Sequence, residues 1–303
     1  MLVTAHAALG RTLMYVGAVT SAHTHFLQGM ALYDPHQHRA SAFLHGEDAG
    51  VNCQGFAARM LWHLGYPEQG LAQSQEAVTL AQQSADSYSL SSALHAAAVF
   101  HHCRRDVRAT QERAAATIRL ATEQGFPHWM AMSVIMQGWA LAQQGQVKEG
   151  MAQMTQGLQA YQATGAAIRR PHFLALLAEA HRITGQPETG LIILTEALAL
   201  VDTTGERWYE PELYRLKGEL LLQQNSDNHT EAASCFQQAL AIARRQQAKS
   251  WELRAATSLS RLWQQQGKRD AARQLLAPIY GWFTEGFDTA DLQEAKALLD
   301  ELA

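Results

Sequence analysis

Proline and cysteine are both scarce in this sequence. Seven prolines are spread over 303 residues, and the three cysteines, Cys53, Cys103 and Cys235, lie far apart without CxxC spacing. Few prolines leave long uninterrupted segments that can be helical. An odd number of distant cysteines supports neither a disulfide framework nor a zinc ribbon. We expect the thiols to pack as small apolar side chains in a protein of the reducing cytoplasm.

The sequence also lacks a block of charge of either sign. Its 24 lysines and arginines are interspersed with 28 aspartates and glutamates, which leaves a formal net charge of −4. Proteins that bind nucleic acids usually carry a basic surplus or a basic stripe. The composition therefore disfavours DNA or RNA as the main partner.

Long apolar runs are absent as well. No segment offers eighteen or more apolar residues without polar breaks, and the opening residues MLVTAHAALGRTLMYVG have no basic stretch ahead of an apolar core. A membrane-spanning helix needs the first feature and a secretory signal needs the second. We therefore expect no membrane partner and a cytoplasmic location.

What the sequence does contain is a repeat of about forty residues in a helix-favouring composition, rich in alanine, leucine and glutamine. The stretch GWALAQQGQVKEGMAQMTQGL, residues 138–158, has a small residue, a leucine three positions later and glycines at 145, 150 and 157. The same spacing of small and apolar residues recurs along the whole chain. The small or anchoring residues of the seven copies are Gly10, Ala58, His95, Gly138, Ala178, Gly218 and Ser260.

This spacing pattern is typical of the tetratricopeptide repeat. In that repeat, small residues let two antiparallel helices approach closely, and large apolar residues fill the gaps between neighbouring pairs. It predicts an all-α fold, a right-handed α-solenoid superhelix that forms a single domain over residues 1–303. The helix pairs are expected at about 3–34, 50–84, 87–124, 128–164, 170–203, 209–247 and 250–281.

A last helix is expected at about 288–302, capped by Asp288 or Thr289, and its apolar face should cover the C-terminal end of the array. The N-terminal end shows no such cap. That difference favours a preceding segment, a tightly bound neighbour or self-association at the first pair.

Three stretches are not demanded by the repeat. They are YDPHQHRASAFLHGEDAG at 33–50, GERWYEPELYRLKGELLL at 205–222, and residues 243–302 with GWFTEGFDTADL. Together they resemble the C-terminal tetratricopeptide region of large bacterial proteins that join a class III adenylate/guanylate cyclase, or a similar output domain, to a signal-transducing ATPase. The resemblance covers essentially the entire chain. It implies a sensor or oligomerisation scaffold, with the catalytic and nucleotide-binding modules upstream in the same polypeptide.

Those catalytic modules have no counterpart in this sequence. It contains no G-x-x-x-x-G-K-[ST] loop, because Gly267-Lys268 lacks both the earlier glycine and the following hydroxyl. Paired metal-binding aspartates of a cyclase are also missing. We therefore expect no enzymatic activity, no catalytic residues and no cofactor.

Two histidine clusters could suggest chemistry. The first comprises His36, His38, His45, Glu47 and Asp48, but H-x-H beside a proline matches no standard metal site. We interpret residues 33–50 as a structural joint between the first two pairs, whose acidic residues cap the next helix. A metal or catalytic site is the less favoured alternative there. The second cluster, His95, His101, His102 and Cys103, is expected to be partly buried or groove-facing in one helix.

The concave face is the surface that the repeat register locates. Positions 2, 5, 9, 12 and 13 of each first helix line it, and an aromatic, arginine and glutamine lining is typical of interaction surfaces. We predict a non-enzymatic scaffold that binds a protein, peptide or ligand there; the alternatives are a free-standing, self-associating structural protein without a groove ligand, or side chains that merely solvate the inner wall. The predicted groove residues are Arg11, Tyr15, Arg59, Trp62, His63, Phe100, Trp139, Gln143, Glu179, Arg182, Glu219, Gln223, Arg261 and Gln264.

Overall fold

A computed structural model describes residues 1–37, 46–84 and 86–303 of the chain. Within these residues every extended regular element is a helix and there is no strand. The histidines at positions 38 and 45, which belong to the metal alternative, lie outside the described residues. No helix in the described ranges combines the length and the apolar composition needed to cross a membrane.

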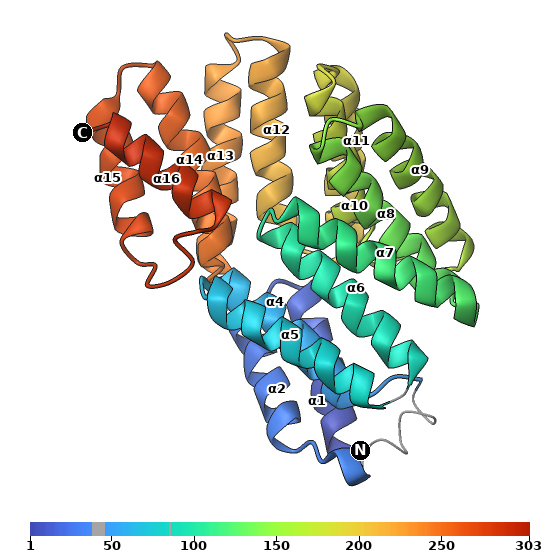
Figure 1. Cartoon of the computed structure of the whole chain (residues 1–303). Helices are drawn as coiled ribbons and strands as arrows, with labels where there is room; N and C mark the ends of the chain where they lie inside the picture. The colour runs from blue at the N-terminus through green and yellow to red at the C-terminus, as the bar shows by residue number, and fades with distance from the viewer. Residues whose placement is uncertain (38–45, 85) are drawn as a thin grey trace. The chain divides into compact units, whose positions relative to one another are not determined.

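The helices follow one another in antiparallel pairs (Figure 1). They are α1 (Leu2–Tyr15), α2 (Val19–Ala31), α4 (Ala49–Leu64), α5 (Pro67–Ser84), α6 (Ser87–Cys103), α7 (Val107–Gln124), α8 (Pro127–Gln143), α9 (Val147–Ala163), α10 (Arg170–Ile183), α11 (Pro187–Thr204), α12 (Glu210–Gln224), α13 (His229–Arg245), α14 (Lys249–Gln265), α15 (Arg269–Tyr280) and α16 (Ala290–Glu301). These bounds fall within about three residues of the predicted pairs, and the predicted all-α solenoid of helix pairs with a C-terminal capping helix is confirmed.

The chain groups into two compact units. The first comprises Met1–Trp62 and Glu68–Ile168, and the second comprises His63–Pro67 and Arg169–Ala303. The sequence alone predicted no internal boundary. That the pairs form one uninterrupted superhelix stays a prediction.

Local capping explains several helix ends. The Asp86 side chain accepts hydrogen bonds from the backbone N–H groups of Tyr88 and Ser89 at the start of α6, and Asp106 does the same for Ala109 in α7. Both satisfy donors that a helix start leaves without partners. Helix α7 ends at Gly125, whose φ of 70° is a left-handed conformation that glycine adopts without steric penalty.

The described part of the stretch 33–50 forms a joint. Asp48 Oδ1 accepts hydrogen bonds from the N–H groups of Gly50 at 2.8 Å and Val51 at 3.2 Å, so this carboxylate caps α4. Its other oxygen accepts from the Tyr33 hydroxyl at 2.7 Å, and its backbone N–H donates to the Ser89 hydroxyl at 2.8 Å. One aspartate thereby ties the end of the first pair to α4 and α6.

Small residues allow the two helices of a pair to approach closely. A Cβ atom placed on Gly138 of α8 would lie 2.6 Å from the carbonyl oxygen of Gly150 in α9 and 2.9 Å from the backbone nitrogen of Met154. Backbone atoms cannot move aside as the end of a flexible side chain can. At this crossing α8 and α9 are therefore in backbone contact, as the repeat pattern predicted.

The capping helix closes the end of the second unit. Its residues Leu292, Ala295 and Leu298 are buried in one apolar cluster together with Leu276 of α15 and Ala256 of α14. The opposite face of α16 exposes polar side chains such as Gln293, Lys296 and Asp300. Helix α16 therefore covers the apolar edge that α14 and α15 would otherwise expose.

The close crossing of α8 and α9 yields a stability prediction. Gly138→Ala should lower the free energy of unfolding by about 1–3 kcal/mol, because the added methyl group meets backbone atoms and must push the helices apart. Urea denaturation followed by circular dichroism measures the change.

A matched control is Gly281→Ala, at the end of α15. There an added Cβ would lie 3.2 Å from the Ala277 carbonyl oxygen, a tight contact but a longer one than at Gly138, and φ is negative, so the loss should stay below about 1 kcal/mol. Equal losses for both variants would contradict the claim that α8 and α9 pack backbone to backbone.

Candidate functional site

Five of the fourteen predicted groove residues are buried. Arg59, Trp62, His63, Phe100 and Trp139 are each at most 3 % exposed. The Arg59 guanidinium carbon lies 4.9 Å from the centroid of the Phe56 ring, and the Trp139 ring meets the His102 ring edge-on at 4.5 Å. The expectation that these side chains face an open groove is corrected, because their helices bury the corresponding faces. The nine others are half-buried or exposed: Arg11, Tyr15, Gln143, Glu179, Arg182, Glu219, Gln223, Arg261 and Gln264.

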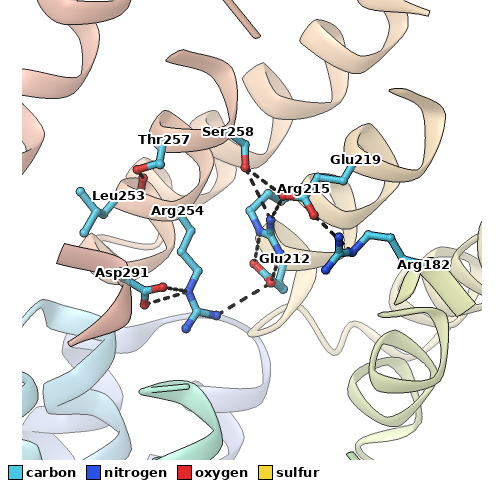
Figure 2. A network of polar contacts seen from close by, with 9 residues as sticks. All are labelled: Arg182, Glu212, Arg215, Glu219, Leu253, Arg254, Thr257, Ser258 and Asp291. Carbon is cyan, nitrogen blue, oxygen red and sulfur yellow. Dashed lines mark hydrogen bonds and ion pairs between the residues drawn. The ribbon is translucent and has the colours of Figure 1, made fainter. Parts of the chain in front are cut away.

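Charged side chains gather on one face of the second unit. Helices α10, α12 and α14 are the first members of successive pairs, and α12 contacts both of the others. Along α12, Glu212, Arg215, Glu219 and Gln223 are spaced by three and four residues, so they share one face of the helix. Figure 2 shows the first three of these side chains meeting residues of α10 and α14, and Arg254 of α14 in turn meeting Asp291 of α16.

Arg215 is the centre of this network. Its Nε donates to Glu212 Oε2 at 2.8 Å and its Nη2 to Glu212 Oε1 at 2.6 Å, a two-pronged pair, while Nη1 donates to Glu219. Burial lowers the pKa of Arg215, but the carboxylates of Glu212 and Glu219 outweigh it and raise that pKa well above the ordinary value. The guanidinium therefore stays charged, and it fixes both glutamates in one orientation.

A second arginine connects α14 to its neighbours on both sides. Arg254 Nε lies 2.9 Å from both Oδ1 and Oδ2 of Asp291 at the start of α16, and its Nη1 is 3.8 Å from Glu212 Oε1. Its guanidinium carbon also lies 4.9 Å from the centroid of the Trp251 ring. The Arg254 and Asp291 side chains are only 9 % and 7 % exposed, so this pair is largely shielded from water.

The network opens to solvent at Arg182 on α10. Arg182 Nε lies 3.6 Å from Glu219 Oε2, and the Arg182 side chain is 37 % exposed. The Gln223 side-chain amide donates to the Arg182 carbonyl at 2.9 Å, which links α12 to α10 near the exposed end. On the α14 side, the Ser258 hydroxyl donates to Glu219 Oε1 at 3.3 Å.

Sequence reasoning found only part of this network. Arg182, Glu219 and Gln223 were predicted, whereas Glu212, Arg215, Arg254, Ser258 and Asp291 were missed. Glu212 and Arg254 occupy position 2 of their repeats, and Arg215 occupies position 5. Both positions belong to the predicted lining, so the repeat register carries the signal for these three residues. Asp291 lies in the capping helix, outside the repeat register, and its sequence carries no comparable signal.

The second histidine cluster is buried in α6. His95 Nδ1 lies 3.1 Å from the Ser133 hydroxyl, and His101 and His102 are less than a tenth exposed. Burial lowers the pKa of His101, although the carboxylate of Asp106 opposes this shift. Among the described residues, no three His, Cys, Asp or Glu side chains come close enough together to hold a metal ion.

The cysteines are not arranged for nucleophilic chemistry. Cys53 and Cys103 are buried and Cys235 is half-buried. Burial is the main cause that raises the pKa of Cys53 to about 12; Arg11 opposes this rise, and Glu47 and Asp48 add to it. Since the thiolate is the reactive form, Cys53 is inert near neutral pH.

The chain is similar in architecture to helical repeat proteins of known structure. No family model matches the sequence, and no curated protein matches it. A Rap protein complexed with competence and sporulation factor is similar over 99 % of this chain and 80 % of its own, with a TM-score of 0.64 and 15 % identity. Aspartyl phosphate phosphatase F from Bacillus subtilis gives a TM-score of 0.55 at 10 % identity, over 98 % of this chain and 68 % of its own.

A tetratricopeptide repeat protein from Parabacteroides merdae is also similar, with a TM-score of 0.51 and 11 % identity over 99 % of this chain and 98 % of its own. Likeness at such low identity reports the fold alone. It confirms a tetratricopeptide-type α-solenoid, and neither the factor bound by one neighbour nor the activity named for another transfers to this chain.

The Arg254–Asp291 pair yields a prediction for the capping helix. Asp291→Ala should lower the free energy of unfolding of the second unit by about 2–4 kcal/mol, because it leaves a shielded guanidinium without its main partner. Thermal denaturation and hydrogen exchange of α16 measure the loss.

The control lies five residues further along the same helix. Lys296→Ala removes an ion pair with Asp300 whose side chains are 53 % and 64 % exposed, so it should change stability by less than about 0.5 kcal/mol. If Lys296→Ala and Asp291→Ala had equal effects, α16 would not be held by its pair with Arg254.

Proposed function

We propose that this chain is a non-enzymatic scaffold that binds a peptide or a segment of a partner protein on the second unit. The binding surface, here called the inner polar face, lies on α10, α12 and α14. Figure 2 shows most of its residues, and Gln223 and Arg261 belong to it as well; the full set is Arg182, Glu212, Arg215, Glu219, Gln223, Arg254, Ser258 and Arg261. The observation that carries the proposal is the network of Figure 2, a fixed set of charged groups that ends at partly exposed side chains.

Stability alone gives a weak reason for such a network. Removing charged groups from water is unfavourable, and well-packed apolar residues in place of a buried ion pair are often as stable or more stable. The inner polar face nevertheless holds Glu212 and Arg215 at 6 % and 14 % exposure. A polar surface that is retained at this cost supports a role in recognition, where arginine is enriched.

The charge balance favours a peptide over a polyelectrolyte. Arg182, Arg215 and Arg254 are matched by Glu212, Glu219 and Asp291, so the formal charges of the network cancel. The exposed Arg261 adds one positive charge beside this neutral network. A single excess charge gives little long-range attraction for nucleic acid. Recognition must then depend on short-range hydrogen bonds. An extended peptide can form them, because its backbone N–H donors and C=O acceptors alternate along the chain.

The groups nearest to solvent suit such a backbone. Arg182 is 37 % exposed, Glu219 is 24 % exposed, and Gln223 and Arg261 are exposed. Guanidinium and amide N–H groups can donate to peptide carbonyls, and carboxylate oxygens can accept from peptide N–H groups. Because Arg215 and Ser258 already hold Glu219, less rotamer entropy is lost when a ligand binds.

The proposed role in signalling rests on similarity to other proteins in structure and in sequence. One structural neighbour was crystallised with competence and sporulation factor, which is consistent with ligand binding by this fold. The sequence resembles the repeat region of bacterial signalling proteins that carry ATPase and cyclase modules. We infer that the natural role is that of a cytoplasmic sensor or interaction region, whose binding event is passed to a nucleotide-dependent output module in the same polypeptide.

A peptide selection tests the proposal. Decapeptides selected from a random phage-displayed library against the 303-residue chain should bind the wild-type protein. The double variant Arg182→Ala and Gln223→Ala should bind them about tenfold to a hundredfold more weakly, because each substitution removes a donor from the inner polar face. Fluorescence anisotropy measures the dissociation constants.

The control changes the same two residue types on another face of the same unit. Arg245 and Gln238 are exposed on α13, and their double substitution by alanine should leave affinity within about twofold of wild type. Equal binding by both double variants, or no peptide enriched at all, would contradict the proposed surface. Nucleotide turnover by the purified chain at an enzyme-like rate would contradict the non-enzymatic assignment.

A further inference from the structure

The outer face of the first helix pair is unusually apolar. Eleven large apolar residues are notably exposed in the described chain, and six of them lie within the first 32 residues. Leu2 is 68 % exposed, and Leu9, Val16 and Leu27 are each between 45 % and 48 % exposed. Exposed apolar residues that gather on one face mark an interaction site more often than scattered ones do.

The large apolar residues exposed on α1 and at its C-cap, Val16, form one stripe. Leu2, Leu9 and Val16 are spaced by seven residues, so they lie on the same side of the helix, opposite the buried Val3, Ala7 and Met14. The stripe is symmetric about Leu9. A second α1 helix placed antiparallel across it would therefore set Leu9 against Leu9 and Leu2 against Val16 at both ends.

The same face carries almost no charge. Arg11 is the sole Asp, Glu, Lys or Arg among the first 33 residues, in a chain of which 17 % is charged. Arg11 follows Leu9 by two residues, so it projects from the opposite side of α1, where it forms an ion pair with Glu47 at 3.6 Å. Two copies of this face can consequently approach each other without like-charge repulsion.

The other terminal helix is built differently. The exposed side of α16 carries Gln293, Lys296 and Asp300, and its apolar side is buried against α14 and α15. A head-to-tail contact would press the uncharged stripe of α1 against these charged groups and leave them without water. The self-matching geometry of α1 instead favours a two-fold contact between like faces.

We propose that the outer face of α1 and α2 is a homodimer interface, in which two copies of the chain pack α1 against α1 in antiparallel orientation about Leu9. Helix α2 packs beside α1 (Figure 1), and its residues Leu27 and Ala31 are exposed as well. This inference is independent of ligand binding on the inner polar face.

The size of the face sets the expected affinity. A helix of 14 residues is about 21 Å long, and two packed helices are about 20 Å wide. The footprint is then about 400 Å² per copy, which is below the roughly 800 Å² per partner of standard stable interfaces. The dimer should form reversibly in the micromolar range.

Sedimentation velocity of the 303-residue chain between about 1 and 200 µM tests the proposal. The mass should rise from that of the 33.4 kDa monomer towards twice that value. Leu9→Glu should weaken association at least tenfold, because it sets two carboxylates against each other at the two-fold axis. Leu9→Lys should do the same, and an equal mixture of the two variants should recover the dimer because opposite charges then meet.

The mixture separates loss of the interface from loss of folding, since a misfolded variant cannot be rescued by another. A matched control is Ile192→Glu, at an apolar side chain of α11 that is 71 % exposed, which should leave association unchanged. A monomer at every concentration overturns the proposal. Association that survives Leu9→Glu, or a mixture that stays monomeric while each variant is folded, overturns it too.

Discussion

The contact on which this structure depends is the close approach of paired helices at small residues. Gly138 and Gly150 bring α8 and α9 into backbone contact, and Gly218 admits the Phe236 ring at the crossing of α12 and α13. A helix pair held this closely presents its remaining apolar side chains to the next pair, and burial of those side chains supplies most of the stability of such an array. The arrangement fixes which helix faces are internal and which can carry polar groups.

The inner polar face is a consequence of that arrangement. Three successive first helices bring residues from different repeat positions together on one side, so Arg182, Arg215 and Arg254 and their carboxylate partners form one network across α10, α12, α14 and α16. Because the network satisfies its own charges, it is rigid, and its exposed edge can offer donors and acceptors to a ligand without large rearrangement. The outer face of α1 and α2 lies in the first unit, and contacts made there do not involve the inner polar face.

Most of the fold could be predicted from the sequence, because glycine and alanine spacing carries the repeat and its register. The pairs and the capping helix follow directly from it. The site was less predictable. Trp62 and Trp139 fit the pattern of a groove lining, yet they are buried, because one repeat position can face either solvent or a neighbouring helix. Asp291 could not be found, since its partner Arg254 lies 37 residues away in another helix.

The most direct measurement of the central claim is the position at which a ligand contacts the second unit. A photo-crosslinking amino acid would replace Gln223 on the inner polar face or, as a comparison, the exposed Gln238 on α13, with mass spectrometry of the product formed with a selected peptide. A ligand on the inner polar face should give crosslinks from position 223 and none from position 238. Crosslinks from position 238 alone, or from neither position while the peptide is bound, would show that the ligand binds elsewhere.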